Sequence, residues 1–236
     1  RRGGVSASPF DSMNVRDGLG DEPSAVARNQ VLLAGAIGVL PVYLNQVHGC
    51  RVVRLSQCDT FGDAPLAEAD ASITTERGIA CAIQVADCLP VLMAAPGGVA
   101  ASHAGWRGLA AGVLEATLAA LCEATGCAPA AVEVWLGPCI GARRFEVGDD
   151  VRRAFVPEPG AAPGLASAPQ TPRFAPLGNG KWLADLPLLA RDRLGVAGVV
   201  SISGGTWCTV EDASRFFSFR RDRITGRMVA AIWLRG

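Results

Sequence analysis

Hydrophobic residues recur at helical spacing early in the chain, and the period then changes. The segment DEPSAVARNQVLLAGAIG carries acidic, Pro and Ser start signals before its apolar repeats, and it predicts a helix over about 22–38. Short runs rich in apolar or β-branched residues follow, separated by Gly, Pro and Asp in the way that strands are. These predicted strands, within 41–105, are PVYLNQVHG, CRVVRLS, ADASITT, IACAIQVA, LPVLMAAP and GVAASHAG.

The second half of the chain mixes both patterns. A long helix is predicted at about 107–125, followed by a strand in AVEVWLGP, a short helix in GDDVRRAFV and a helix in WLADLPLLARDRLG. The segment 157–181 is rich in Pro, Gly and Ala, and it predicts a long exposed loop. RFFSFRRD and TGRMVAAIWLRG predict a β-hairpin with its turn near 223–226. This mixture, without a repeat of fixed period, predicts an α/β or α+β fold.

Composition and charge narrow the class of partner. The 236 residues, half of them hydrophobic, are enough for a full core in one large domain or two small ones. The 22 basic residues balance the 22 acidic ones, so no long-range field favours nucleic acid or a membrane surface, and a small-molecule partner is expected. No run approaches the ~18 to 20 apolar residues of a membrane span, and the start lacks a signal-peptide pattern, so we predict a cytoplasmic protein. The oligomeric state stays open.

Three residues with metal-binding side chains lie at the ends of predicted strands or at a break between them. His48 lies in NQVHG, Cys88 in QVADCLPVL and His103 in ASHAGWRG, and the chain has no other histidine. Because they are dispersed, single residues rather than close pairs, they suit a three-ligand site with an open fourth position. The alternative is that both histidines are structural and that the cysteine, like most of the eight, is a small buried group. The two glycines, indole and guanidinium around His103 favour a metal site.

Other residues carry side chains that could bind a substrate. LGPCIGARRFEVG offers the guanidinium forks of Arg143 and Arg144 to a phosphate or carboxylate, unless both are merely solvated in a surface loop. The arginines of FSFRRD could likewise bind an anion, or they could be solvated charges on an edge strand. Aromatic rings able to stack on a planar base, or to pack in the core, belong to Trp106, Phe216, Phe217 and Phe219.

The motifs RRGGVS, NQVHG, QVADCLPVL, SHAGWRG, LGPCIGARRFEVG and FSFRRDRITGRMVAAIWL together resemble the laccase-domain family. This family is also called the polyphenol oxidase or peptidoglycan-editing factor family, and it is related to purine nucleoside phosphorylases of that type. The resemblance implies one domain over 1–236 with a mixed-sheet α/β/β/α sandwich, and zinc held by His48, Cys88 and His103. The chain departs from the family at Gln30, where Arg is usual, and at Phe145, where Tyr is usual, which bears on substrate contacts.

The number of histidines limits the metals that the chain can bind. Two histidines cannot supply a multicopper cluster, although one copper with Met93 as a weak axial ligand is chemically possible. Zinc ranks higher because it needs no axial ligand, and with one thiolate it keeps a charge of +1 that favours an anion. The resemblance implies phosphorolysis of adenosine, inosine, guanosine and methylthioadenosine, with adenosine deamination.

We assign further roles around that metal. Arg107 and Arg143 would bind phosphate, with Arg107 acting in catalysis, and Asp87 would orient a ligand or move a proton. Cys139 would contact the substrate.

Besides a copper-dependent polyphenol oxidase, two alternatives to the phosphorylase remain. One is a cysteine hydrolase or amidase with Cys88 as nucleophile and His103 or His48 as base, editing a cytosolic peptidoglycan precursor. The other is a non-enzymatic partner protein in which a metal staples strand ends, with Cys139 as fourth ligand. Zinc content separates the first alternative from the phosphorylase, because a metal-bound thiolate is a poor free nucleophile.

Overall fold

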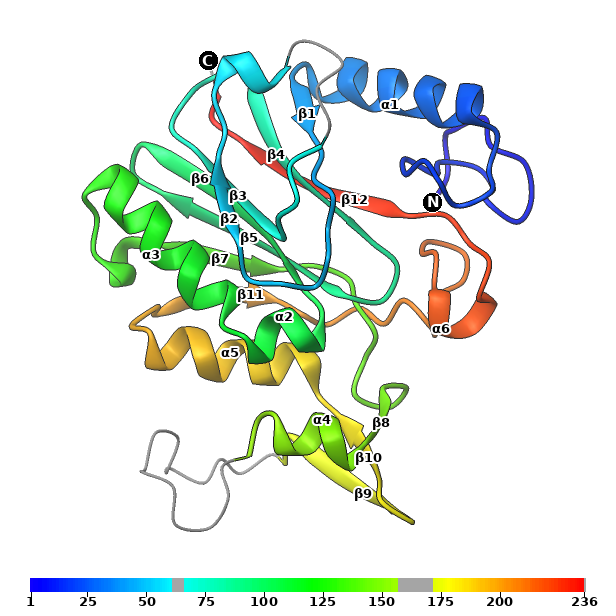
Figure 1. Cartoon of the computed structure of the whole chain (residues 1–236), viewed down its shortest axis with the longest axis vertical. Coiled ribbons are helices and arrows are strands. Elements are labelled where there is room, and N and C mark those ends of the chain that lie inside the picture. Colours follow the sequence, from blue (N-terminus) through cyan, green and yellow to red (C-terminus); the bar gives the residue numbers. More distant parts are fainter. Residues whose placement is uncertain (61–65, 157–171, 236) are drawn as a thin grey trace.

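Two β-sheets form the centre of the molecule, and helices lie outside them (Figure 1). The computed structural model describes residues 1–60, 66–156 and 172–235. The larger sheet has the strand order β11-β7-β5-β6-β3-β2 and mixes parallel with antiparallel pairs. Its strands are β2 (Val52–Arg54), β3 (Ala71–Thr74), β5 (Leu89–Ala95), β6 (Gly98–Ala104), β7 (Glu133–Leu136) and β11 (Ser201–Gly204).

The second sheet has the order β1-β4-β12, with β4 parallel to β1 and antiparallel to β12. Its strands are β1 (Leu40–Val42), β4 (Ile79–Val85) and β12 (Met228–Trp233). A small antiparallel sheet extends from the main body and consists of β8 (Glu146–Gly148), β10 (Lys181–Ala184) and β9 (Phe174–Gly178).

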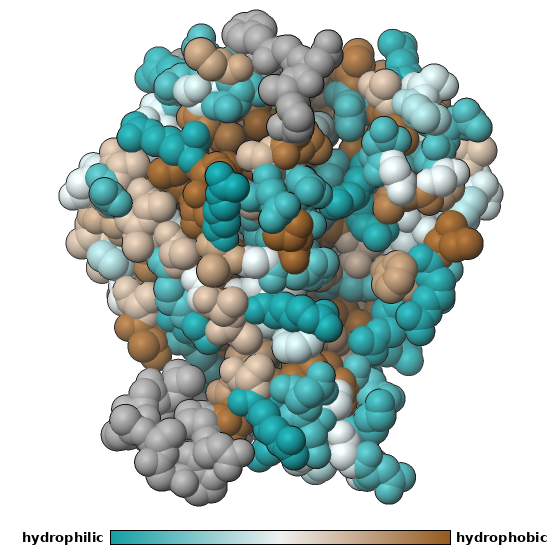
Figure 2. Space-filling model, viewed as in Figure 1, coloured by the Kyte–Doolittle hydropathy of each residue, from teal (hydrophilic) through white to brown (hydrophobic). Residues whose placement is uncertain are grey.

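The helices lie on opposite sides of the molecule, with α3 and α5 far from α1 in Figure 1. They are α1 (Pro23–Ile37), α2 (Trp106–Ala110), α3 (Val113–Thr125), α4 (Asp149–Arg153), α5 (Leu186–Val196) and α6 (Phe219–Asp222), with short 3₁₀ turns at Gln57–Thr60 and Pro129–Ala131. Within the described ranges, none of these helices has the length and apolar character needed to span a membrane. On the face shown in Figure 2, hydrophobic residues lie interspersed among hydrophilic ones.

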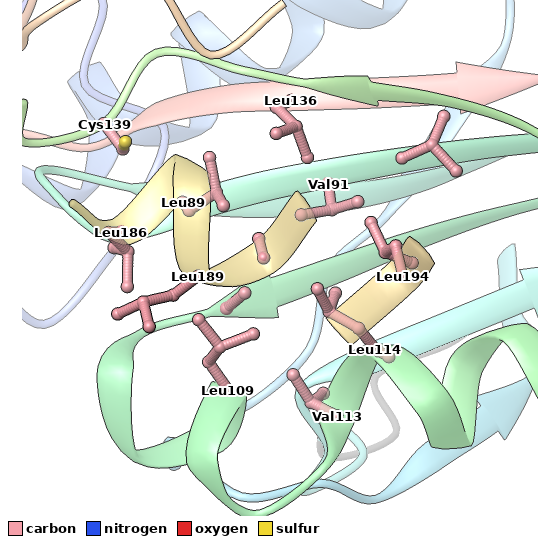
Figure 3. Close-up of a cluster of buried hydrophobic side chains, with 14 of the residues drawn as sticks. Leu89, Val91, Leu109, Val113, Leu114, Leu136, Cys139, Leu186, Leu189 and Leu194 are labelled. Atoms are coloured by element: carbon pink, nitrogen blue, oxygen red, sulfur yellow. The ribbon is translucent and has the colours of Figure 1, made fainter. Parts of the chain in front are cut away.

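Two apolar layers stabilise this arrangement. In the first, leucines and valines of α2, α3 and α5 pack on β5 and β7, as Figure 3 shows for Leu109, Val113, Leu114, Leu189 and Leu194 against Leu89, Val91 and Leu136. The second layer fills the space between the sheets and includes Leu44, Ile79, Ile83 and Val99. Every residue of β4 and β6 is buried, because these strands are covered on both faces. Their near-continuous apolar sequences follow from that burial.

The predicted mixed α/β fold is confirmed, and so is the first helix. It begins with Pro23 in its first turn and ends at Gly38, whose φ of 73° is the left-handed value that favours glycine at a helix end. The prediction of one long helix at 107–125 was wrong in one respect. Gly112 has a φ of 94°, and this residue separates α2 from α3.

Two further predictions were wrong. The segment before β12 is not the first strand of a hairpin, because the Ser218 hydroxyl accepts a hydrogen bond from the Arg221 N–H at 3.2 Å and begins α6. β12 pairs with β4 instead. In the predicted loop 157–181, the part 157–171 lies outside the described residues, whereas Phe174–Gly178 is strand β9, paired antiparallel with β10.

Candidate metal centre

The three predicted metal ligands meet where β5 begins and β6 ends, in the middle of the large sheet. One ligand atom from each of His48, Cys88 and His103 lies within 4.8 Å of the others, and within the described chain these residues form a candidate metal-binding group. Cys88 Sγ lies 3.7 Å from His48 Nε2, and the two imidazole rings have their centroids 4.7 Å apart. The pairing of β5 with β6 explains part of this, because Pro90 faces His103 across the two strands and Cys88 directly precedes β5.

Asp70, which the sequence reasoning missed, links both histidines. Its Oδ1 lies 2.7 Å from Nδ1 of buried His103, and its two carboxylate oxygens accept backbone N–H bonds from Val47, His48 and Gly49 at 2.7 to 3.1 Å. This carboxylate therefore fixes the ring of one histidine and the backbone that carries the other. The available signal was an Asp directly before the buried strand ASIT, because a charge buried there needs several partners.

Glycines allow the strand ends to approach one another. A Cβ atom on Gly105 would lie 2.8 Å from His48 Cδ2 and 3.0 Å from Cys88 Sγ, and one on Gly108 would lie 2.7 Å from the carbonyl oxygen of Gly49. The 2.8 and 2.7 Å distances are shorter than real Cβ atoms show, and the 3.0 Å distance is tighter than an ordinary contact. The glycines of HAGWRG are thus explained by the close packing of the NQVHG loop against this turn and α2.

Without a metal, Cys88 and His103 strongly shift each other's pKa. Burial opposes ionisation of Cys88, but the two imidazoles, His103 above all, outweigh it and lower the pKa of this thiol to about 6. Burial also disfavours the charged form of His103, yet Cys88 and then Asp70 raise the pKa of its imidazole to about 9. A thiolate beside a protonated imidazole is therefore the favoured state near pH 7, and a thiolate is the form that binds metal.

A pocket of about 340 Å³ opens onto the cluster. Besides the three candidate ligands, residues from four separate parts of the chain line it, namely Arg16, Leu19, Gln46, Gln84, Val85, Ala86, Phe219 and Arg227. The glutamines form a rigid wall, since Gln46 and Gln84 exchange side-chain and backbone hydrogen bonds at 2.8 and 2.9 Å. The sequence reasoning singled out neither Arg16 nor Arg227.

Asp87 and Cys139 lie beside this centre in different surroundings. Asp87, with a φ of 95°, accepts hydrogen bonds from the Thr209 hydroxyl and the Arg220 N–H, both at 2.6 Å. Cys139 is fully buried at the edge of the hydrophobic layer shown in Figure 3, with its Sγ 3.5 Å from the carbonyl oxygen of Ile140. Burial raises the pKa of the Cys139 thiol well above its ordinary value. The candidate metal-binding group does not include it.

The two arginines expected to bind phosphate lie elsewhere. Arg107 is exposed on α2, with its guanidinium 4.5 Å from the centre of the Trp106 ring. Arg143 forms a two-pronged ion pair with Glu211, at 2.8 and 3.2 Å, and its side chain is 84% exposed. Neither residue is among those that line the pocket at the cluster. Their role in binding phosphate stays a prediction.

Comparison with known sequences gives consistent matches over the chain. The profile of a family described as multi-copper polyphenol oxidoreductase laccase matches residues 1–235. A protein of Pseudomonas aeruginosa named purine nucleoside phosphorylase is 45% identical over 237 residues, covering 99% of this chain and 90% of that protein. Purine nucleoside phosphorylase YfiH of Escherichia coli is 46% identical over 240 residues, covering 99% of this chain and 91% of its own.

Solved structures have the same fold. A Neisseria meningitidis protein from a family of unknown function superimposes on this chain with a TM-score of 0.88 at 43% identity. The match covers 100% of this chain and 91% of that protein. YlmD of Geobacillus stearothermophilus superimposes with a TM-score of 0.89 at 32% identity, covering 100% of this chain and 89% of its own.

Proposed function

The chain belongs to the multi-copper polyphenol oxidoreductase laccase family, and from this membership we propose that it is a zinc-dependent purine nucleoside phosphorylase. One observation carries the proposal: the convergence of His48, Cys88 and His103 within 4.8 Å at the floor of a pocket. The names of the Pseudomonas and Escherichia relatives support the reaction class. The size of the pocket, about 340 Å³, suits a small molecule.

The donor atoms fit zinc better than copper. The 3.7 Å between Cys88 Sγ and His48 Nε2 is close to the ~3.6 Å edge of a tetrahedron with Zn–N of about 2.1 Å and Zn–S of about 2.3 Å. A blue-copper site would need a weak axial ligand, and the expected one, Met93, is fully buried in the hydrophobic layer beneath the helices. Two histidines in the whole sequence exclude a multicopper cluster despite the family's description.

The reaction joins phosphate to a ribose. A phosphate oxygen attacks C1′ of the nucleoside, the bond from C1′ to the purine nitrogen breaks, and the base leaves with a proton while ribose 1-phosphate forms. Zinc, when bound, would supply Lewis acidity for an oxygen atom in the pocket. The chain's own residues shape the site, since Asp70 orients His103 and the Gln46–Gln84 pair keeps one wall of the pocket rigid.

We extend the proposal to the substrates that the family resemblance implies, which are adenosine, inosine, guanosine and methylthioadenosine. We also propose adenosine deamination, in which water replaces the amino group of the base and ammonia leaves. Both activities need the same pocket, because both act on a purine nucleoside with an oxygen nucleophile.

One observation favours a second candidate, the cysteine hydrolase or amidase. Cys88 Sγ lies within 3.7 Å of His48 Nε2, so a metal-free site would hold a thiol and a base in the arrangement that nucleophilic catalysis requires. Its substrate would be an amide such as a cytosolic peptidoglycan precursor.

Metal content and base release decide between these candidates. We expect about one zinc per chain by mass spectrometry on protein purified without a metal-affinity tag, and phosphate-dependent release of hypoxanthine from inosine. His48→Ala and Cys88→Ala should lose both, whereas Cys58→Ala, at an exposed cysteine outside the cluster, should keep both. Protein that is metal-free, inactive on nucleosides and alkylated at Cys88 would support the hydrolase instead.

A further inference from the structure

Two arginines from opposite ends of the chain line the pocket at the candidate metal ligands. Arg16 belongs to the segment before α1, and Arg227 directly precedes β12, and both line the pocket together with His48, Cys88 and His103. Backbone contacts hold their segments together. The Val15 N–H donates to the carbonyl oxygen of Arg227 at 3.3 Å, and the Arg227 N–H donates to Asn14 Oδ1 at 2.9 Å. The fold therefore brings these two segments together, and both arginines line one pocket.

The positive charge of this pair is only partly offset, because the charges of Cys88 and Asp87 act on Arg227 without forming an ion pair with it. Among the ion pairs in the described part of the chain, none involves Arg16 or Arg227, in contrast with Arg143 and Arg144, which share Glu211. Within the described residues, the hydrogen bonds of the Arg227 guanidinium go to the carbonyl oxygens of Thr225 and Gly226, at 3.0 and 3.2 Å. Burial, and next the charge of Arg16, lower the pKa of the Arg227 guanidinium. Two half-buried like charges that line one pocket favour the binding of an anion there.

Phe219 completes the wall on this side. Its ring, 47% exposed, has the guanidinium carbon of Arg227 at 5.9 Å from its centre. A cation held against an aromatic face keeps its position with fewer hydrogen bonds, so the remaining N–H groups stay available to a ligand.

We infer that Arg16 and Arg227 form an anion subsite that binds inorganic phosphate next to the metal cluster. The identity of the anion rests on the proposed phosphorylase function. Guanidinium forks match the geometry of phosphate oxygens, and two of them can neutralise most of its charge. A phosphate bound there shares one pocket with the three candidate ligands, as attack on a bound nucleoside requires. This subsite differs from the one predicted at Arg107 and Arg143.

The test compares five matched Arg→Gln variants with the wild type, all zinc-loaded. Inorganic phosphate is titrated by calorimetry, and the KM for phosphate is measured in inosine phosphorolysis. We expect Arg16→Gln and Arg227→Gln to raise the dissociation constant of phosphate and the KM for phosphate by about tenfold or more each. Arg54→Gln is the inert control, because Arg54 is exposed on β2, where it donates to Thr75. Arg107→Gln and Arg143→Gln test the sequence-based alternative.

The outcomes separate the subsite from the reaction. Wild-type protein that binds phosphate but releases no base, with binding weakened in Arg16→Gln, would support the subsite and overturn the phosphorylase. Phosphorolysis with an unchanged KM for phosphate in Arg16→Gln would overturn the subsite and keep the phosphorylase. Phosphate binding that is lost only in Arg107→Gln or Arg143→Gln would also overturn the subsite at Arg16 and Arg227. Wild-type protein that does not bind phosphate would overturn the subsite. Arg16→Gln decides even if Arg227→Gln fails to fold, because the Arg16 guanidinium makes no hydrogen bond within the described residues.

Discussion

The carboxylate of Asp70 lies 2.7 Å from Nδ1 of His103, and both side chains are almost completely buried. The same carboxylate accepts the backbone N–H groups of Val47, His48 and Gly49. Asp70→Asn removes the charge that orients His103 and replaces one acceptor oxygen by a donor that faces N–H groups. We expect zinc affinity to fall by roughly 10- to 100-fold, and the free energy of unfolding to fall by about 1.5–3 kcal/mol.

Competition with a chromogenic chelator measures the affinity, and thermal unfolding of the zinc-free protein measures the stability. Asp59→Asn serves as control, since Asp59 accepts hydrogen bonds from Ser56 in an exposed turn. Unchanged zinc affinity in Asp70→Asn would contradict a role of Asp70 in the metal centre.

The second prediction concerns the reactivity of Cys88 in zinc-free protein. The His103 and His48 imidazoles outweigh burial and lower the pKa of this thiol to about 6. A lowered pKa means that the thiolate forms as pH rises through about 6, so alkylation by iodoacetamide should increase from pH 5 to 7 and then level off. A free cysteine in solution, with a pKa near 8.5, should still accelerate above pH 8.

Peptide mass spectrometry follows alkylation at Cys88 alone, and glutathione in the same tube is the reference thiol. Added zinc should protect Cys88. A rate that keeps rising above pH 8 would show that the imidazoles do not lower the pKa of this thiol, and a rate that zinc leaves unchanged would show that Cys88 does not bind the metal.

The third prediction concerns Gly105, whose missing side chain leaves room for the cluster. Gly105→Ala places a methyl group 2.8 Å from His48 Cδ2 and 3.0 Å from Cys88 Sγ, so His48 must move. We expect at least a roughly tenfold loss of zinc affinity. Gly35→Ala is the matched control on α1, where an added Cβ meets no atom within 4 Å, and it should keep zinc and gain about 0.4–1 kcal/mol of stability. Equal zinc affinity in both variants would contradict the steric argument.

The parts of the fold that could be predicted are those governed by local sequence. Pro23 and Gly38 mark the ends of α1, and burial on both faces gives β4 and β6 their apolar runs. The segment before β12 could not be predicted in the same way. The aromatic and basic residues of RFFSFRRD suit an edge strand, whereas the hydrogen bond at the Ser218 cap begins a helix there.

The candidate site also contains residues that the sequence could predict and residues that it could not. His48, Cys88 and His103 are rare residue types in distinctive motifs, so their convergence was foreseeable, and the structure brings them together. Arg16 and Arg227 lie 211 positions apart in a chain with many arginines, and no local pattern distinguishes them. Their proximity depends on β12 returning to pair with β4 beside the N-terminal segment.

The last prediction separates two roles for Asp87. The sequence predicts proton transfer or ligand orientation, whereas the hydrogen bonds from Thr209 and Arg220 occupy both carboxylate oxygens and favour a role in holding the C-terminal segment against the site. Asp87→Asn should keep the acid limb of the pH–rate profile and more than a tenth of kcat, because Asn tolerates the φ of 95° and one hydrogen bond survives. Asp87→Ala should lose about 2–4 kcal/mol of unfolding free energy, since it combines an unpaired buried hydroxyl with backbone strain. Proton transfer by Asp87 predicts the opposite pattern for Asp87→Asn, with kcat lowered by roughly 10² to 10⁴ and the limb abolished at unchanged Tm.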